Sequence, residues 1–437
     1  MDRGSGMRKG WKIRMSAGYC LLVLGGLLAG AQEAQWRGPE RSGVFPDTML
    51  LTEWPEGGPD RIFVTEGIGR GFSSAVATGE MIFVTGTRDS TEYLTAMDLE
   101  GNIIWQKPYG KSWDQSVPDA RCTPTVDGDR VYVLTGRDRL SCFRTGSGEK
   151  IWSVDLHEEY KSHWDMFGVS ESLLLVDGKV IATPGGEVTT VIALDKMNGG
   201  LVWKSATLNA QRSNLSPVLI RHCGRQYIIT ATRTHVISVD PENGAILWQY
   251  HYNVLDEKGE NTTILANTPT YSDSCLWITS GWDRESVMLE IMPDGRSVKE
   301  KFSDRTFDNQ NHGVVLVDGY LYGSNFTDRN SGKWVCMNWS TGEIVWIAEF
   351  HNKGPVIAAD GMLYCCDEKH GNMGLVRASP EKFDLVSSFR VEDGIGPYWA
   401  RPTIFNRMLL IRHGDVLVAY NIAKNQTVRQ LSGQVVK

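Results

Sequence analysis

The chain has 437 residues, of which 41% are hydrophobic and 22% are charged, so it can bury a large core and is not an intrinsically disordered protein. The formal net charge is −7, and no basic cluster stands out along the chain. Nucleic acid and anionic membrane surfaces are therefore excluded as expected partners.

The first 31 residues have the three parts of a secretory signal peptide. Basic residues come first, an apolar run follows over residues 19–28, and Ala29-Gly30-Ala31 offers a small-x-small cleavage site. This apolar run is too short to span a bilayer, and the chain has no other apolar run that is long enough. No transmembrane segment is therefore expected. The alternative is that the run remains uncleaved and anchors the protein. Residues 1–31 hold five basic residues and one acidic residue, so the exported chain has a net charge of −11. We expect it in the periplasm or outside the cell.

Residues 61–437 are predicted to form one repeat domain, with residues 32–60 as an N-terminal extension. Each repeat begins with two apolar strands around a two-residue turn, often Asp-Gly, which suits a type I′ hairpin. Eight turns indicate eight repeats. Their first residues recur every 42 to 50 positions, at Thr78, Asp127, Asp177, Cys223, Asp273, Asp318, Asp360 and Asn406.

A second signature follows the hairpin: a strand, a turn with glycine, and a tryptophan. Lys299 takes the place of the tryptophan in the fifth repeat. We expect each tryptophan to wedge between neighbouring repeats, with its indole N–H on a carbonyl. The tryptophans are Trp105, Trp152, Trp203, Trp248 and Trp346.

Four short strands per repeat, with almost no helical periodicity, predict an all-β fold. We expect an eight-bladed β-propeller of four-stranded antiparallel blades. A linear β-solenoid is the alternative, which a hairpin in every period disfavours. The strand-like residues 61–66 are expected to join the last blade near residues 419–421 and close the ring, and the alternative is local closure by residues 427–431.

The hairpin followed by A-x-D-x-x-x-G-x-x-x-W resembles the PQQ-like repeats of quinoprotein dehydrogenases and of the B lipoprotein of the outer-membrane β-barrel assembly machinery. With Gln35-Trp36-Arg37-Gly38-Pro39, the chain is most similar to secreted PQQ-binding-like β-propeller repeat proteins. The resemblance covers residues 35–425 and implies a fold more than an activity. The lipoprotein would have a lipidated cysteine after the signal, which residues 31–33 lack. The dehydrogenases imply a quinone clamp, calcium and often haem, but no Cys-x-x-Cys-His is present.

Residues that enter the innermost strands should converge on one mouth of the central channel. Four polar residues stand six positions before their turn markers, and others, including Ser73, fall near them. Such a ring could hold a carboxylate-rich or sugar-like ligand, although a water-filled pore also needs a polar lining. The ligand-binding candidates are Ser74, Arg121, Glu171, Asn267, Asn311, His312, Lys353, Trp399 and Arg401.

Two further motifs invite chemistry. His157 and His163 stand six apart, unlike the four-apart histidines of a zinc helix, so we expect a solvated loop and no metal site. Cys365 and Cys366 fall on the second strand of the seventh hairpin, where neighbouring side chains point to opposite faces. Two free thiols are predicted. The alternative is a strained vicinal disulfide, like the ring over the quinone in some dehydrogenases.

The sequence therefore predicts an exported, non-catalytic binding or scaffolding propeller, expected to be a monomer without a cofactor. A protein or saccharide partner would bind across the channel mouth, and no catalytic residue can be named. The alternative is an oxidoreductase similar to PQQ-dependent alcohol or polyvinyl-alcohol dehydrogenases, with PQQ in the channel and calcium near a Glu or Asn. A structural component of the cell envelope is a third possibility.

Overall fold

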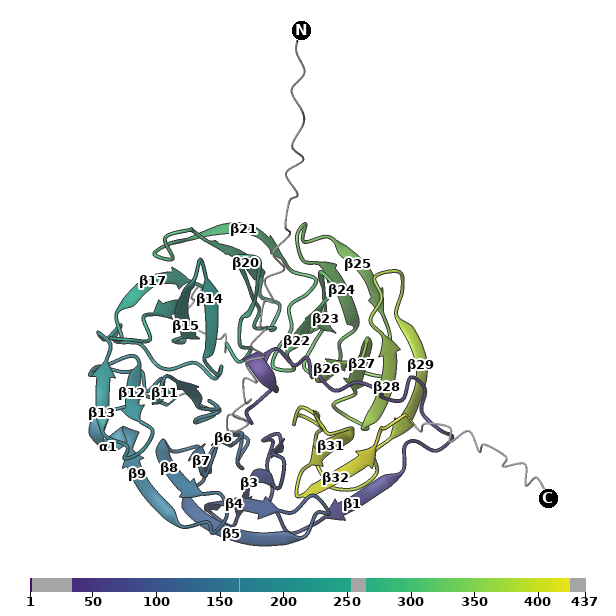
Figure 1. Ribbon diagram of the computed structural model, residues 1–437, viewed down its shortest axis with the longest axis horizontal. Coiled ribbons are helices and arrows are strands. Elements are labelled where there is room, and N and C mark those ends of the chain that lie inside the picture. Colours follow the sequence, from purple (N-terminus) through teal and green to yellow (C-terminus); the bar gives the residue numbers. More distant parts are fainter. Residues whose placement is uncertain (2–33, 165, 253–264, 425–437) are drawn as a thin grey trace, which may run out of the picture. The chain divides into compact units, whose positions relative to one another are not determined.

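The computed structural model describes Met1 and residues 34–164, 166–252 and 265–424. Within these ranges the strands form eight four-stranded antiparallel sheets around a central channel, which confirms the eight-bladed propeller (Figure 1). The predicted signal peptide and the alternative closing residues 427–431 lie outside the described residues. No helix in the described ranges has the length and apolarity needed to cross a membrane.

Blades 1 to 7 run from the channel outward in chain order, and in blade 8 the outermost strand comes from the start of the domain. Blades 1 and 2 are β2 (Val76–Ala77), β3 (Ile82–Arg88), β4 (Thr91–Met97) and β5 (Ile103–Lys111), then β6 (Thr125–Asp127), β7 (Arg130–Leu134), β8 (Arg139–Arg144) and β9 (Lys150–Asp155). Blades 3 and 4 are β10 (Leu174–Val176), β11 (Lys179–Ala182), β12 (Ile192–Asp195) and β13 (Leu201–Lys204), then β14 (Val218–His222), β15 (Arg225–Ala231), β16 (His235–Val239) and β17 (Ile246–His251).

The second half of the ring repeats this plan. Blades 5 and 6 are β18 (Thr270–Ser272), β19 (Cys275–Ile278), β20 (Ser286–Ile291) and β21 (Val298–Asp304), then β22 (Val314–Val317), β23 (Tyr320–Ser324), β24 (Trp334–Asn338) and β25 (Ile344–Ala348). Blade 7 is β26 (Val356–Ala359), β27 (Met362–Cys366), β28 (Asn372–Arg377) and β29 (Asp384–Arg390). Blade 8 is β30 (Thr403–Phe405), β31 (Met408–His413), β32 (Val416–Asn421) and β1 (Arg61–Thr65).

The ring closes through the N-terminal strand, as predicted. β1 is the outer strand of blade 8 and pairs antiparallel with β32, with Val64 opposite Val418 and Thr65 opposite Leu417. Thr65 Oγ1 also donates to the carbonyl of Gly101 in blade 1, at 2.7 Å. The two ends of the repeat domain are therefore joined within one sheet.

The hairpin turns follow the expected chemistry in most blades. At Asp177-Gly178 both central residues have positive φ, 45° and 79°, as a type I′ turn requires. Blade 2 differs: Asp127 pairs with Arg130, so the turn is Gly128-Asp129, one position later than predicted. Gly128 has φ 59° while Asp129 is not in the positive region, which is the type II′ pattern with glycine first.

Tryptophans join neighbouring blades as predicted, with one correction. In the fifth blade Phe302, and not Lys299, opposes the small-residue slot at Met288, because Lys299 pairs with Glu290 further along the strand. The indole of Trp248 has no hydrogen-bond partner among the described residues. The others donate to a carbonyl of the next blade: Trp105 to Thr145 at 2.9 Å, Trp152 to Lys196 at 3.2 Å, Trp203 to Pro241 at 3.1 Å and Trp346 to Ser379 at 3.0 Å.

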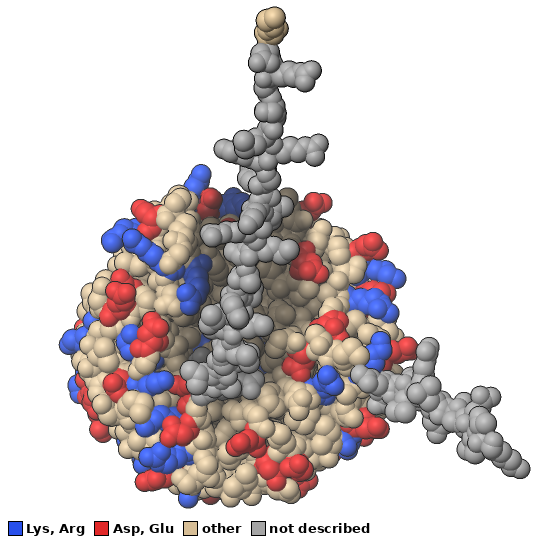
Figure 2. Space-filling model, in the orientation of Figure 1, with Lys and Arg blue, Asp and Glu red and all other residues tan. Residues whose placement is uncertain are grey.

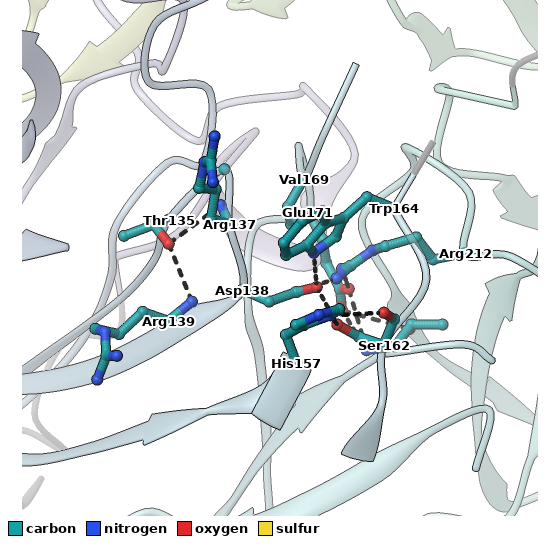
Figure 3. A network of polar contacts seen from close by, with 12 residues as sticks. Thr135, Arg137, Asp138, Arg139, His157, Ser162, Trp164, Val169, Glu171 and Arg212 are labelled. Atoms are coloured by element: carbon teal, nitrogen blue, oxygen red, sulfur yellow. Dashed lines mark hydrogen bonds and ion pairs between the residues drawn. The ribbon is translucent and has the colours of Figure 1, made fainter. Parts of the chain in front are cut away.

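A buried ionic network links blades 2, 3 and 4 (Figure 3). Arg212, just before β14, pairs with Asp138 between β7 and β8 and with Glu171 just before β10. The three side chains are at most 1% exposed. Glu171 also accepts the backbone N–H of Thr183 at 3.1 Å. Burial raises the pKa of Glu171 to about 7, and the Arg212 charge opposes that rise.

The segment with the two spaced histidines is anchored to this network. It begins with the short helix α1 (Leu156–Tyr160), where we expected a loop, while His157 and His163 are exposed, as expected. Ser162 Oγ and Trp164 Nε1 donate to Asp138 Oδ2 at 2.6 and 2.7 Å, and the His157 ring stacks on Trp164. These contacts fix the segment to Asp138 of blade 2. No group of three or more His, Cys, Asp or Glu in the described ranges is arranged to hold a metal.

The adjacent cysteines are free thiols, as predicted. They point to opposite faces of β27: Cys365 belongs to the apolar cluster that includes Val356, and Cys366 to the cluster that includes Leu409. Both are buried in apolar surroundings, and this burial raises the pKa of both thiols. Each fills a small slot on its own side of blade 7.

We expect iodoacetamide to label the native protein at Cys223, because this thiol is exposed in a hairpin turn while the other described cysteines are buried. Peptide mapping after alkylation, before and after denaturation, measures this. Cys365 and Cys366 should react only after denaturation. A peptide carrying both residues and lighter by two hydrogen atoms would contradict the assignment as free thiols.

We expect Arg212→Met to lower the free energy of unfolding by about 3–5 kcal/mol, because it leaves two buried carboxylates without a counter-charge. Urea unfolding of the purified variant measures the loss. Arg144→Met is the matched control, because Arg144 pairs with Asp129 at the surface and its removal should cost only about 0–1 kcal/mol. Equal losses in the two variants would contradict this role for the network.

Candidate functional site

A cavity of about 610 Å³ lies in the central channel and is lined by residues from all eight blades. Many lining residues precede an innermost strand, such as Arg121 before β6, Ser216 before β14 and Arg401 before β30. The cavity therefore lies at the end of the channel where these strands begin. Its volume falls in the range of about 300–1,000 Å³ that is usual for small-molecule sites.

The N-terminal extension crosses the channel at the inner end of this cavity. Trp36 is 5% exposed and lines the cavity. The next residues are fixed to the blades: Arg41 Nη1 donates to the carbonyls of Ser172 and Pro217 at 2.8 and 2.9 Å, and Arg37 donates to the carbonyl of Val314. Figure 1 shows this segment, with the 3₁₀ turn η1 (Pro39–Arg41), at the centre of the ring.

The extension then runs outward along the hairpin-turn end of blades 7 and 8. Leu50 N–H donates to Asp360 Oδ2 at 3.0 Å, and Arg407 N–H donates to Asp47 Oδ1 at 2.7 Å. Because this end is opposite to the starts of the innermost strands, the extension covers one end and leaves the cavity at the other. The Gln-Trp-Arg-Gly-Pro element thus supplies a cavity floor, with Trp36 at its surface.

Aromatic rings and cations alternate along the cavity and beside it. The rings of Trp282 and Phe326 have centroids 5.3 Å apart. Arg329 lies over Trp282 at 5.6 Å, and Lys353 lies over Phe326 at 4.4 Å. Elsewhere on the cavity the rings of Phe72 and Trp399 have centroids 5.1 Å apart. Such walls suit a ligand that combines a flat apolar face with negative charge.

Asp308 braces the loops that carry two of these rings. Its buried carboxylate accepts the backbone N–H of Asp283, next to Trp282, at 3.0 Å and that of Phe326 at 3.1 Å. Burial raises the pKa of Asp308 to about 7, against the effect of both hydrogen bonds. The carboxyl group therefore links the positions of two mouth loops from blades 5 and 6.

Glu368 is the carboxylate that lines the cavity. Its Oε2 lies 3.0 Å from Nε2 of His312 and accepts Nε1–H of Trp399 at 2.8 Å, and Lys353 Nζ lies 3.8 Å from Oε1. Burial raises the pKa of Glu368, but His312 and Lys353 outweigh this and hold it below its ordinary value. The negative charge of Glu368 is thus already met by protein groups.

The nine predicted candidates divide into two groups. Those that line the cavity are Arg121, Asn311, Trp399 and Arg401. The others are buried beside it and bonded within the protein: Ser74, Glu171, Asn267, His312 and Lys353. For example, Ser74 N–H donates to Thr123 Oγ1 at 3.0 Å, and Asn267 Nδ2 donates to Asn309 Oδ1 at 2.9 Å.

Sequence reasoning missed a second source of lining residues. Trp282, Arg329 and Glu368 lie in loops between the second and third strands of their blades, and Lys369 follows Glu368. In an antiparallel blade the second strand ends where the first begins, so these loops reach the same mouth. Counting from the end of each second strand could have located them.

We expect the stability contributed by Asp308 to fall as the pH rises. The folded protein keeps a proton on Asp308 up to a pKa of about 7, whereas the ordinary value is 3.8. Stability linked to this proton is complete below the lower value and is lost through the higher one. Asp308→Asn lacks this titration. In urea unfolding, the stability of the variant relative to the original protein should therefore be higher at pH about 8 than at pH about 4.5. The same difference in unfolding free energy between variant and original protein at both pH values would contradict the raised pKa of Asp308.

The cavity belongs to a fold with recognisable relatives. A family described as "Outer membrane protein assembly factor BamB" matches residues 90–348. The assembly factor BamB of Alkalilimnicola ehrlichii is 26% identical over 182 residues, 41% of this chain and 43% of the relative. That of Shewanella oneidensis is 23% identical over 190 residues, 41% of this chain and 44% of the relative. The alignments thus span less than half of these curated relatives.

Solved structures show the same fold. BamB from Moraxella catarrhalis matches with a TM-score of 0.62 at 16% identity, over 83% of this chain and 99% of that one. Quinohemoprotein alcohol dehydrogenase from Comamonas testosteroni matches with a TM-score of 0.65 at 11% identity, over 91% and 81%. At these low sequence identities the similarity shows the fold alone. Since the family match covers more than half of its length, the chain belongs to the PQQ-like β-propeller family described as outer membrane protein assembly factor BamB.

Proposed function

We propose that this chain is an exported, non-catalytic binding or scaffolding propeller of the cell envelope, acting as a monomer. Its ligand or protein partner inserts a group into the central cavity through the open mouth. The observation that carries the proposal is the cavity itself: about 610 Å³, floored by Trp36 and lined by aromatic rings and cations. The relatives named outer membrane protein assembly factor BamB support a protein partner in the envelope.

The charge pattern supports a ligand more than a solvent-filled pore. Among the described lining residues, four are cationic, whereas the one carboxylate, Glu368, is bonded to His312 and Trp399. Over the face shown in Figure 2, acidic and basic residues are interspersed without a block of one sign. The excess of positive charge is therefore a property of the cavity and not of that outer surface.

The second candidate, a PQQ-dependent alcohol dehydrogenase, is favoured by the same cations and tryptophans, which would suit a planar polycarboxylate. The calcium that such enzymes imply fits less well, because calcium takes six to eight oxygen ligands, usually with several carboxylates. Glu368 is the carboxylate among the described lining residues. The cysteine pair is buried in two apolar clusters and does not line the cavity. These features favour binding without catalysis.

The test is calorimetric titration with soluble envelope saccharides and peptides, comparing the original protein with Trp282→Ala and Trp399→Ala. Removing a central aromatic contact should weaken binding by about tenfold or more. Met197→Ala, on an exposed hairpin outside the cavity, is the matched control and should bind normally. Binding that survives both tryptophan changes would overturn the assignment of the site.

The absence of catalysis is tested separately. The protein is supplied with PQQ and calcium, and dye reduction is followed with a panel of alcohols. We expect no turnover above that of PQQ and calcium alone. Turnover that disappears in Arg121→Ala, a cavity variant, would replace the binding function with the oxidoreductase.

A further inference from the structure

Two arginines at the cavity floor carry positive charge without a carboxylate partner in the part of the chain that the structure describes. The guanidinium groups of Arg401 and Arg37 lie 4.8 and 5.6 Å from the ring of Trp36. Arg37 donates to the carbonyls of Arg41, Ser42 and Val314, and Arg401 Nη2 donates to the carbonyl of Asn311. Neither forms an ion pair with a carboxylate of the described residues, and Nε of Arg401 makes no hydrogen bond there.

The backbone at Gly313 makes room for both groups. A Cβ at this position would meet Arg37 Nη1 and would lie 3.3 Å from Arg401 Nε, and Gly313 has φ 79°. Burial and, after it, the charge of Arg37 together lower the pKa of Arg401 to about 9. Two like charges held together out of water destabilise the protein unless an anion compensates them.

The remaining lining points to the kind of molecule that brings the anion. Asn214, Gln310, Asn311 and Asn330 line the same cavity, and amides both donate to and accept from hydroxyl groups. The faces of Trp36, Trp282 and Trp399 offer flat apolar surfaces of the kind on which the C–H face of a sugar ring packs. Hydroxyls, an apolar face and a carboxylate occur together in a uronic acid.

We propose that the cavity binds an acidic saccharide, with the carboxylate of one uronic acid unit held at the floor beside Arg401. This rests on the proposed binding function and assigns its ligand class. The planar guanidinium matches the geometry of a carboxylate, and Arg401 lines the cavity while Arg37 lies behind it. Arg329 and Lys369 are exposed at the mouth, where they attract further acidic units of the same chain.

The test compares uronic acid oligosaccharides with their methyl esters, which keep the size and the sugar face but lose the charge. The probes are oligomers of galacturonate, mannuronate and glucuronate, titrated by calorimetry into the full chain. We expect the best acidic oligomer to bind at least about tenfold more tightly than its ester, as a charged hydrogen bond in a cavity would give. Arg401→Gln should reduce that ratio to about threefold or less.

Two further variants guard against misfolding and nonspecific charge effects. Arg401→Lys keeps the charge without the planar fork and should retain part of the preference for the acid. Arg144→Gln removes a charge from the outer hairpin of blade 2 and should leave the ratio unchanged. Circular dichroism and the thermal unfolding midpoint of each variant show that the fold is retained.

The outcomes separate this inference from the function on which it rests. Equal binding of acids and esters, still lost in Trp282→Ala, would overturn the floor site and leave the binding function in place. Binding of sulfated oligosaccharides or of hexaglutamate, but of no uronate, would overturn the ligand class. If no saccharide or peptide binds, the acidic-saccharide proposal and the binding function both fail.

Discussion

The contact between blades is the interaction on which this structure depends, because a four-stranded sheet cannot cover both its faces alone. The rings of Trp105, Trp152 and Trp203 lie on the turn of the next blade, at Gly148, Gly199 and Gly244. These glycines have positive φ, and a Cβ on any of them would overlap the ring. One residue type therefore satisfies both the turn and the contact, and its recurrence spaces the blades evenly. A row of blades joined by such contacts has an exposed sheet face at each end unless the row closes into a ring. Strand β1 closes the ring.

Closure creates a channel, and the N-terminal extension turns this channel into a cavity. The innermost strands begin with carbonyl groups that point into the channel, and Arg37 and Arg41 bind several of them. Trp36 lies against Arg37 and lines the cavity. The same segment supplies β1, so one stretch of the chain both completes blade 8 and floors the site. Fold stability and site geometry are linked through residues 34–65.

Much of the fold could be predicted because it rests on local patterns that repeat. Alternating strands, Asp-Gly turns and spaced tryptophans were enough for eight blades and for closure by residues 61–65. The errors were local: a turn one residue late at Gly128, and Phe302 in place of Lys299. The second arises because the β20–β21 hairpin is longer than its counterparts with a tryptophan: Met288 pairs with Phe302 fourteen positions on, whereas Ala193 pairs with Trp203 ten positions on. Neither shift leaves a mark in the spacing of the repeats.

Less of the site could be predicted. The position of a residue in the repeat shows that it lies near the central channel, but not the direction in which its side chain points. Glu171 and Arg401 both precede innermost strands, yet Glu171 turns into the wall to meet Arg212, 41 positions away. That partner belongs to no repeated position. Trp282 and Arg329 lie in loops of unequal length, so their offsets from the hairpins do not recur.

The contrast between Arg212, which is buried, and Arg401, which is partly buried, separates stability from function. Arg212 is met by two carboxylates and stabilises the packing of three blades. Arg401 faces a second arginine and a tryptophan and forms no ion pair with a carboxylate of the described residues. A protein under selection for stability alone would replace an uncompensated, partly buried cation with an apolar residue of similar volume. Its presence at the floor of a cavity is the physical reason to look for an anionic ligand there.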